Sequence, residues 1–344
     1  MHPITYFYPE DHEAHASPGH PERPERLEAV KEALVNNELW ALGPKLAPLE
    51  LTEDVYRAIH TSEHLDRLKS LSNGGQDYDF ETYLTKQSWP LALSAAGGSA
   101  AVAQAVWRRE AASGFALSRP PGHHATPDQA MGFCLINNIA IAAQHVLQNE
   151  GAKRIAIIDM DVHHGNGTQD IFWERDDVFF VSTHQSPLFP GTGHLNERGA
   201  GEGLGYTCNI PLPPNSGDLA FDAAFDEIIL PLLDGFQPEM ILISFGFDAH
   251  WKDPLAQMQL SSDGYAHQVQ KLQNWAQANC SGRISLFLEG GYDLEAGSAC
   301  GLAVTHSMLG QKWHDLIGPS PSIESDRWRS ILAQSKSIWE IHDD

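Results

Sequence analysis

The stretch Arg154-Ile-Ala-Ile-Ile-Asp159-Met-Asp161-Val-His163-His164-Gly165-Asn166-Gly167 decides the fold of this chain. Its run of four apolar residues, bounded by charge and glycine, predicts a short buried strand of a parallel sheet. Side chains two residues apart on extended backbone face the same way, so Asp159, Asp161 and His163 are expected on one side. An Asp-x-His pair suits Zn²⁺, which accepts carboxylate oxygen and imidazole nitrogen. A solvated acidic loop is the alternative, but such loops rarely follow an apolar strand so directly.

The composition indicates an ordinary globular protein with a large core, because 42% of the 344 residues are hydrophobic and 19% are charged. A net charge of −23 argues against nucleic acid and anionic membranes as partners and is compatible with cationic substrates. No apolar run reaches membrane-spanning length, and the first residues do not resemble a signal peptide. The four cysteines are widely spaced without a Cys-x-x-Cys pair, which predicts a reducing, cytoplasmic setting.

Apolar periodicity predicts that strands and helices alternate along the chain. Strands are expected at 4–8, 115–118, 155–158, 178–184, 240–248 and 283–292. Helices are expected at 27–34, 53–71, 90–112, 133–149, 219–234, 262–279 and 323–340, the last as a C-terminal capping helix. This alternation predicts an α/β fold with a central parallel sheet of about eight strands and helices on both faces. Because no linker or repeat divides the chain, residues 1–344 are expected to form one domain.

Several of the expected strands end in side chains able to do chemistry, and these ends meet at one edge of a parallel sheet. Three protein ligands with an open position are the arrangement of catalytic zinc, whereas structural zinc sites are closed and usually rich in cysteine. Asp161, His163 and Asp248 supply three such ligands. A strand-end aspartate taken alone is more often a helix cap, so the argument rests on the combination.

Two further strand ends offer groups that move protons or donate hydrogen bonds. His123 and His124 follow the strand at 115–118, and an imidazole that is not a ligand is a natural proton carrier beside a metal site. Tyr292 follows a Gly-Gly pair and is placed to donate a hydrogen bond to a developing oxyanion. A lone tyrosine is more often a packing residue, but together these groups predict an active site.

These segments resemble the histone deacetylase family within the arginase–deacetylase fold, and they are most similar to its bacterial amidohydrolases. The resemblance covers roughly residues 5 to 310, and its specificity comes from the combination of motifs. The matching segments are His20–Arg26, Arg119–Ala125, Gly132–Asn138, Asp159–Gln169, Gly246–Asp248, Asp253-Pro254 and Glu289–Tyr292.

The resemblance implies a zinc-dependent deacetylase that hydrolyses a linear amide, with one Zn²⁺ per chain. It implies zinc ligation by Asp161, His163 and Asp248. It implies that His124 acts as general base and then acid, that Asp159 pairs with His123, and that Tyr292 polarises the acyl carbonyl. Asn166 stands where class I members have a second acid, so the chain looks like class II. Whether Zn²⁺ or Fe²⁺ is the metal in the cell stays open.

The resemblance also implies a binding tunnel for the acylated chain of the substrate. Phe133 and Phe189 match its aromatic walls with Gly132 beside them, and Leu255 matches a position at its rim. Arg26 is similar to the arginine that lines an internal acetate channel. Structural K⁺ is implied at two sites, the first on Asp159, Asp161, His163, Ser182 and Thr183 and the second on Phe172, Arg175, Val178 and Tyr206.

Two other functions compete with this interpretation. Arginase-like ureohydrolases use two manganese ions and need two further acids, at positions that Gly165 and His250 occupy here, so a two-metal site is not expected. A catalytically silent binder of acyl-lysine or polyamines would be expected to lose a ligand, a tandem histidine or the tyrosine, and none is missing.

The expected substrate is an acetylated lysine peptide or protein, or another acetylated amine. Polyamine-selective relatives carry a glutamate right after the Asp-Pro pair, where this chain has Leu255, an apolar residue without charge. We therefore expect acyl-lysine to be preferred over acetylpolyamines. The physiological substrate, the acyl chain length and the oligomeric state stay open.

Overall fold

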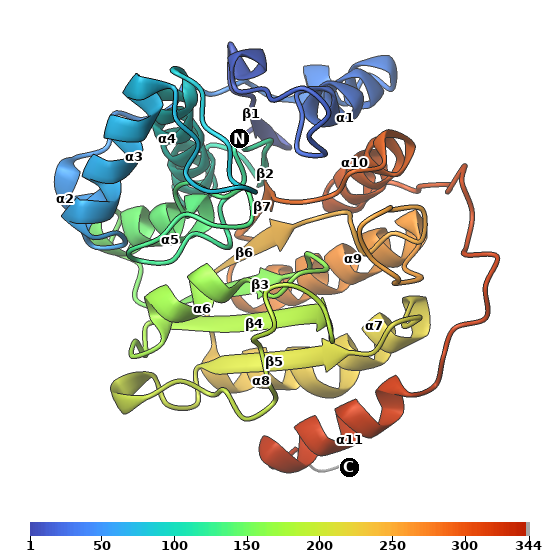
Figure 1. Cartoon of the computed structure of the whole chain (residues 1–344). Coiled ribbons are helices and arrows are strands. Elements are labelled where there is room, and N and C mark those ends of the chain that lie inside the picture. Colours follow the sequence, from blue (N-terminus) through green and yellow to red (C-terminus); the bar gives the residue numbers. More distant parts are fainter. Residues whose placement is uncertain (342–344) are drawn as a thin grey trace.

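Seven strands form one sheet in which every neighbouring pair runs parallel (Figure 1). The computed structural model describes residues 1–341. The strand order is β1-β2-β7-β6-β3-β4-β5. The strands are β1 (Thr5–Phe7), β2 (Ser113–Ala116), β3 (Ile155–Asp159), β4 (Val178–Gln185), β5 (Thr207–Leu212), β6 (Met240–Phe245) and β7 (Ile284–Leu288).

Helices cover both faces of this sheet, so the predicted α/β architecture is confirmed. On one face lie α2 (Glu53–Arg57), α3 (Ser62–Gly74), α4 (Ser88–Trp107), α5 (Asn138–Asn149) and α6 (Asn166–Phe172). On the other lie α1 (Glu25–Asn36), α7 (Asp218–Ala224), α8 (Leu230–Phe236), α9 (Ser262–Asn279), α10 (Leu294–Met308) and α11 (Trp328–Ile338), with a π-helical turn at Phe225–Ile229 between α7 and α8.

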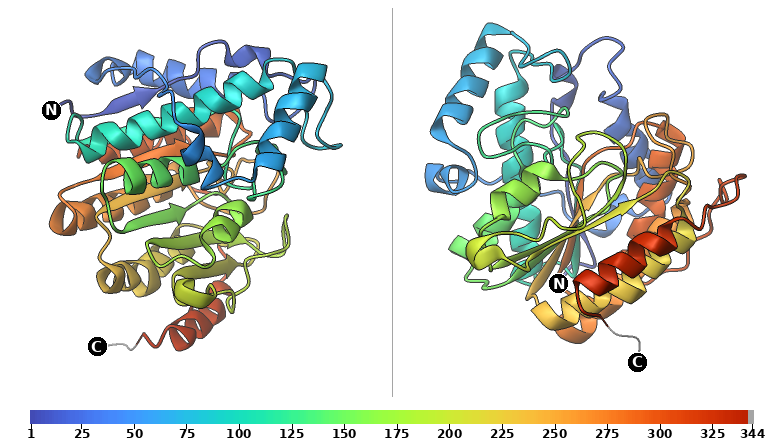
Figure 2. Two further views of the ribbon diagram at one scale, coloured as in Figure 1. Left: turned by 90° about the vertical axis from the view of Figure 1, so that its left-hand side faces the viewer. Right: turned by 60° about the horizontal axis from the view of Figure 1, so that its bottom comes forward.

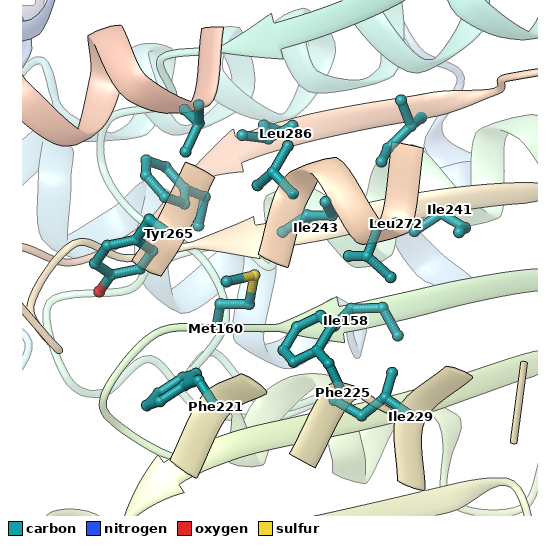
Figure 3. Packing of buried hydrophobic residues seen from close by; sticks show 14 of the residues in the cluster. Ile158, Met160, Phe221, Phe225, Ile229, Ile241, Ile243, Tyr265, Leu272 and Leu286 are labelled. Carbon is teal, nitrogen blue, oxygen red and sulfur yellow. The ribbon is translucent and has the colours of Figure 1, made fainter. Parts of the chain in front are cut away.

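The alternation of side chains along β3 divides the core into two layers. Ile155 and Ile157 enter the cluster shared with α4 and α5, whereas Ile158 enters the cluster on the opposite face. Figure 3 shows Ile158 beside Phe225 and Leu272, which come from helices on that second face. Because β3 is buried on both sides, its residues are almost all apolar, as the sequence pattern indicated.

The order in which strands are added to the sheet reverses at β3, and this reversal places the site. From β3 the sheet grows through β4 to β5 on one side, while β6 and β7 lie on the other. In such a sheet the crevice beyond the carboxyl ends at the reversal point is where ligands bind. The segments that follow β3, β6, β7 and β2 therefore gather around one crevice.

The sheet has seven strands where about eight were expected, and β5 was not located from sequence. Its residues include Asn209 and Pro211, which are uncommon in strands, and Pro211 is tolerated because β5 is at the edge. The helix expected at 53–71 is two helices, α2 and α3. The helix expected at 133–149 begins only at Asn138, where the Asn137 side chain caps it by accepting a hydrogen bond from the amide of Ala140.

The last described helix, α11, lies beside the edge strand β5 and the helical segment α7–α8 (Figure 2). Its buried side chains Trp328 and Leu332 belong to the apolar cluster on that face. An uncovered edge strand offers unpaired backbone groups to other chains, and α11 covers part of the sheet next to such an edge.

A buried ion cluster joins the N-terminal loop to the sheet. Glu22, Arg26 and Arg119 are fully buried, and both guanidinium groups donate to Glu22 Oε1, at 3.1 Å from Arg26 and 2.7 Å from Arg119. Burial alone raises the pKa of the Glu22 carboxyl, but Arg119 and Arg26 offset this and lower the pKa to about 2. Glu22 is therefore ionised at neutral pH, and its single negative charge is shared by two buried cations.

We expect Glu22→Gln to destabilise the fold by about 3–5 kcal/mol, because it leaves two buried guanidinium groups without their counterion. Urea unfolding at pH 7 measures this. Glu53→Gln is the control, since Glu53 pairs with Arg57 on an exposed helix surface and its loss is expected to cost at most about 0.5 kcal/mol.

The low pKa of Glu22 predicts that the stability lost in Glu22→Gln depends on pH. The folded pKa of Glu22, about 2, lies below the ordinary value of 4.5, so its stabilisation is fully present above about pH 4.5 and is lost as the pH falls toward 2. The stability difference between wild type and Glu22→Gln should narrow over that range. An unchanged difference at low pH would contradict the ionised state assigned to Glu22.

Candidate active site

Three side chains from two neighbouring strands converge beyond the carboxyl end of the sheet. Asp161 and His163 follow β3, and Asp248 follows β6, its partner strand. The His163 Nδ1 atom lies 3.1 Å from Asp161 Oδ1 and 3.2 Å from Asp248 Oδ2. One ligand atom from each residue lies within 4.8 Å of the others, a spacing at which the three can hold one metal ion.

The donor atoms of this cluster fit a cation. Backbone amides donate to both oxygens of Asp161, from Gly290 N to Oδ2 and from His163 N to Oδ1, each at 2.8 Å. Only one oxygen of Asp248 has such a partner, Oδ1, which accepts from Val162 N at 2.9 Å. The other Asp248 oxygen, Oδ2, is buried and makes no well-directed hydrogen bond to any of residues 1–341. A buried carboxylate oxygen left in this way is expected to have a cation as partner, and two carboxylates with one imidazole suit Zn²⁺.

Gly290 leaves room for this cluster. A Cβ atom at Gly290 would lie 2.3 Å from Asp248 Oδ2 and 2.6 Å from Asp161 Oδ2. Any side chain there would therefore displace both carboxylates, which gives a physical reason for glycine at this position.

The two adjacent histidines stand next to the metal-ligand cluster, and each is oriented by a polar side chain. His123 Nδ1 lies 3.0 Å from Asp159 Oδ2, and His124 Nδ1 lies 2.8 Å from Asn166 Oδ1. An amide oxygen only accepts, so the His124 Nδ1 must carry the proton and its Nε2 has the free lone pair. The His124 ring centroid lies 5.9 Å from that of His163.

Burial and nearby charges shift the pKa values of the two histidines in opposite directions. Burial lowers the pKa of His123, but Asp161 and Asp159 more than offset it and raise the pKa to about 10. Burial also lowers the pKa of His124, to well below its ordinary value, and His123 and His163 add to this shift. A neutral His124 can accept a proton, whereas a protonated His123 cannot.

Tyr292 stands in the turn that follows β7, the turn whose Gly290 amide donates to Asp161. The Arg26 guanidinium lies 4.9 Å from the centre of the Tyr292 ring, and the Phe133 ring stands edge-on at 6.1 Å. Burial raises the pKa of Tyr292 well above its ordinary value. The hydroxyl therefore keeps its proton at neutral pH and is available as a hydrogen-bond donor.

The residues expected to line a tunnel stand around these groups. The Phe189 ring lies 5.1 Å from the His124 ring, edge to face, and Phe189 is 38% exposed. Gly132 fits between them, because a Cβ atom there would lie 2.4 Å from the His124 ring and 3.0 Å from Phe189. Phe133 has a positive φ of 68°, and Leu255 is 37% exposed, as a rim position would be.

A comparison with family sequence profiles matches residues 20–308 to the family described as "Histone deacetylase domain". The chain belongs to the histone deacetylase family. A "Probable deacetylase" of Archaeoglobus fulgidus is 41% identical over 91% of this chain and 88% of that protein. A "Histone deacetylase-like amidohydrolase" of Pseudomonas aeruginosa is 40% identical over 86% of this chain and 78% of that protein.

A solved structure, "Crystal Structure of HDA15 HD domain", has the same fold. It superposes with a TM-score of 0.90, covers 98% of this chain and 95% of its own, and is 34% identical in sequence. The resemblance of this chain to histone deacetylases, expected from its motifs, is confirmed. Among residues 1–341, no helix is both long and apolar enough to cross a membrane.

Some of the positions that the deacetylase resemblance assigned to potassium lie together. Asp159 pairs with Ser182 across β3 and β4, and the Thr183 hydroxyl donates to the Asp159 carbonyl at 3.3 Å. For the second set, the Arg175 amide donates to the Phe172 carbonyl at 3.1 Å. Val178 begins the adjoining strand β4, and the Tyr206 carbonyl accepts from Phe180 in that strand.

The sequence argument assigned no role to Glu289, although it lies within a quoted motif. Its buried carboxylate accepts hydrogen bonds through Oε2 from the amides of Gly122, at 2.6 Å, and His123, at 3.0 Å. Glu289 at the end of β7 thus holds the tandem-histidine loop that follows β2. In the sequence its signal is a charged residue that directly follows an apolar strand and precedes Gly-Gly.

We expect Asp248→Asn and His163→Ala each to weaken binding of the divalent metal sharply, while His124→Ala keeps the metal and loses turnover by about 10²–10⁴-fold. The metal content of dialysed protein and the hydrolysis of an acetyl-lysine amide measure the two effects. His267→Ala, a change at an exposed histidine of α9, is the control and should alter neither. A His124→Ala protein without metal would mean that this histidine is a ligand.

Proposed function

We propose that this chain is a zinc-dependent amidohydrolase that removes acetyl or related acyl groups from lysine-like amines. The observation that carries the proposal is the group Asp161, His163 and Asp248 beside the tandem histidines, in which the buried Asp248 Oδ2 accepts no well-directed hydrogen bond from residues 1–341. Three ligands leave a coordination position open for substrate or water, as catalysis requires.

Amide hydrolysis needs an activated water, a stabilised oxyanion and a proton for the leaving amine. Zn²⁺ held by these three residues would polarise the acyl carbonyl and bring the pKa of water toward about 7. His124 Nε2, with its free lone pair, accepts the proton from the water and returns it to the amine nitrogen. Asn166 orients this imidazole through Nδ1 but adds no charge that would raise its basicity.

The remaining groups complete the site. Asp159 holds His123 and is the counter-charge for its imidazolium. Tyr292 donates a hydrogen bond to the carbonyl oxygen as it gains negative charge. Phe133 and Phe189 flank the apolar stem of the acylated chain, and Leu255 contacts it at the rim. Arg26, whose guanidinium donates to the carbonyls of Gly291 and Glu289, lines the path for the acetate product.

The proposal extends to bound ions and setting. We propose one Zn²⁺ per chain, with K⁺ as a structural ion at the two groups of residues described above. All four cysteines are buried and free, which supports a reducing, cytoplasmic setting.

Hydrolysis of an acetyl-lysine peptide by the zinc-loaded chain tests the proposed function directly. The expected result is turnover that chelation abolishes and added Zn²⁺ restores. Zinc binding without turnover of any acyl-lysine or acetylpolyamine would instead favour a silent binding protein.

We expect Tyr292→Phe to keep the fold and the zinc but to lower kcat on acetyl-lysine by about 10²–10³-fold, the usual effect of removing one oxyanion donor. Only the hydroxyl is removed, so substrate binding should change little. Tyr56→Phe on α2 is the matched control and should leave kcat unchanged. A near-wild-type kcat for Tyr292→Phe would refute the role given to the tyrosine.

The substrate preference rests on Leu255. We expect kcat/KM to be higher for an acetyl-lysine peptide than for acetylated spermidine or putrescine, because an apolar rim offers no partner for the further charges of a polyamine. Leu255→Glu should move this ratio toward the polyamine. Leu255→Gln is the control, because glutamine has nearly the size of glutamate but no charge. A wild-type preference of about tenfold for the polyamine, or ~1.4 kcal/mol, would overturn this assignment.

A further inference from the structure

We propose that Asp253 is a positioning residue that holds the oxyanion donor Tyr292 and the rim residue Leu255 in register with each other. The inference rests on the proposed function, since it concerns how that function's tyrosine is placed. Asp253 lies in the loop after β6 and is only 6% exposed.

The contacts of Asp253 join two loops through one carboxylate. Its Oδ2 accepts hydrogen bonds from the backbone amides of Tyr292, at 2.6 Å, and Asp293, at 3.3 Å. Its Oδ1 accepts from the amide of Leu255 at 2.9 Å. Asp293 in turn caps α10 by accepting from the amide of Ala296 at 2.8 Å, so the catalytic turn is fixed to a helix on its far side.

Tyr292 needs such a support because its own segment contains two glycines, the residue that restricts the backbone least. The turn from β7 into α10 contains Gly290 and Gly291, and Gly291 has a φ of +108° that few other residues adopt. Within residues 1–341 no hydrogen bond is made by the Tyr292 hydroxyl, so its position depends on the backbone and on ring contacts with Arg26 and Phe133. The Asp253 hydrogen bond at Tyr292 N is the contact that fixes the backbone at the tyrosine itself.

The geometry explains why a carboxylate is required. Its two oxygens face two different loops and both accept from N–H groups, which a carboxyl group offers on both sides and an amide on only one. Asparagine has nearly the same shape but must turn its NH₂ group toward one of the loops, where donor would meet donor. Asp253→Asn therefore releases either Leu255 or Tyr292 while changing little volume.

Two substrates together distinguish a misplaced Tyr292 hydroxyl from a general loss of structure. Acetyl-lysine has a poorly electrophilic carbonyl and depends on the tyrosine for polarisation, whereas the electron-withdrawing fluorines make trifluoroacetyl-lysine less dependent on it. Misplacing the hydroxyl should lower kcat for acetyl-lysine by about ten- to a hundredfold and for trifluoroacetyl-lysine by much less. Partial unfolding or loss of zinc would instead lower both activities by the same factor.

The experiment compares wild type, Asp253→Asn, Tyr292→Phe and the double variant on both substrates, with zinc content measured on each sample. We expect Asp253→Asn to keep its zinc, to lose activity mainly on acetyl-lysine, and to add little to the loss already caused by Tyr292→Phe. Asp315→Asn is the matched control, because Asp315 Oδ1 also accepts from two backbone amides, those of Ile317 and Gly318, but lies between α10 and α11. It should leave the ratio of the two activities unchanged.

The proposal would be overturned if Asp253→Asn lost activity equally on the two substrates or kept the wild-type ratio of the two activities. It would also be overturned if the losses in the double variant were additive. If Asp253→Asn does not fold, Asp253→Ser makes the same test, since a serine hydroxyl is too short to reach both loops. Failure of the proposed function looks different: Tyr292→Phe would then hydrolyse acetyl-lysine normally, whatever Asp253→Asn does.

Discussion

The parallel pairing of β3 with β6 is the contact on which the site depends. It sets Asp159 opposite Ser244, and the two chain segments then leave the sheet together, one with Asp161 and His163 and the other with Asp248. A shift of this pairing by one residue would turn the ligands to opposite faces of the sheet. The metal-ligand cluster is thus a consequence of sheet register at the place where the strand order reverses.

Buried carboxylates that accept backbone N–H groups hold the loops around this crevice. Asp161 accepts from Gly290 after β7, and Glu289 accepts from Gly122 and His123 after β2. Asp253 accepts from Tyr292. Each bond joins segments from different strands, so ligands, proton carrier and hydroxyl are positioned before substrate arrives. Such preorganisation lets fixed groups stabilise a charged transition state without rearrangement.

The parts of the fold that could be predicted are those with strong local signals. The apolar runs of β3 and β6 and the helical spacing of α9 left little choice of structure. The edge strand β5 escaped prediction because it contains Asn209 and Pro211 and gains its strand conformation from pairing with β4. Likewise the late start of α5 follows from the capping side chain of Asn137, preceded by a loop that packs Gly132 against His124.

The sequence by itself determined which donor atoms and proton carriers the chain possesses, because Asp161, His163, His124 and Tyr292 stand next to recognisable strand ends. Only the tertiary structure decided that Glu289 and Asp253 hold these groups in place. Their partners are backbone amides, 166 residues away for Glu289 with His123 and 39 residues away for Asp253 with Tyr292. Every residue except proline offers the same N–H group, so no side-chain pattern marks such a partner, and the folded chain alone selects it.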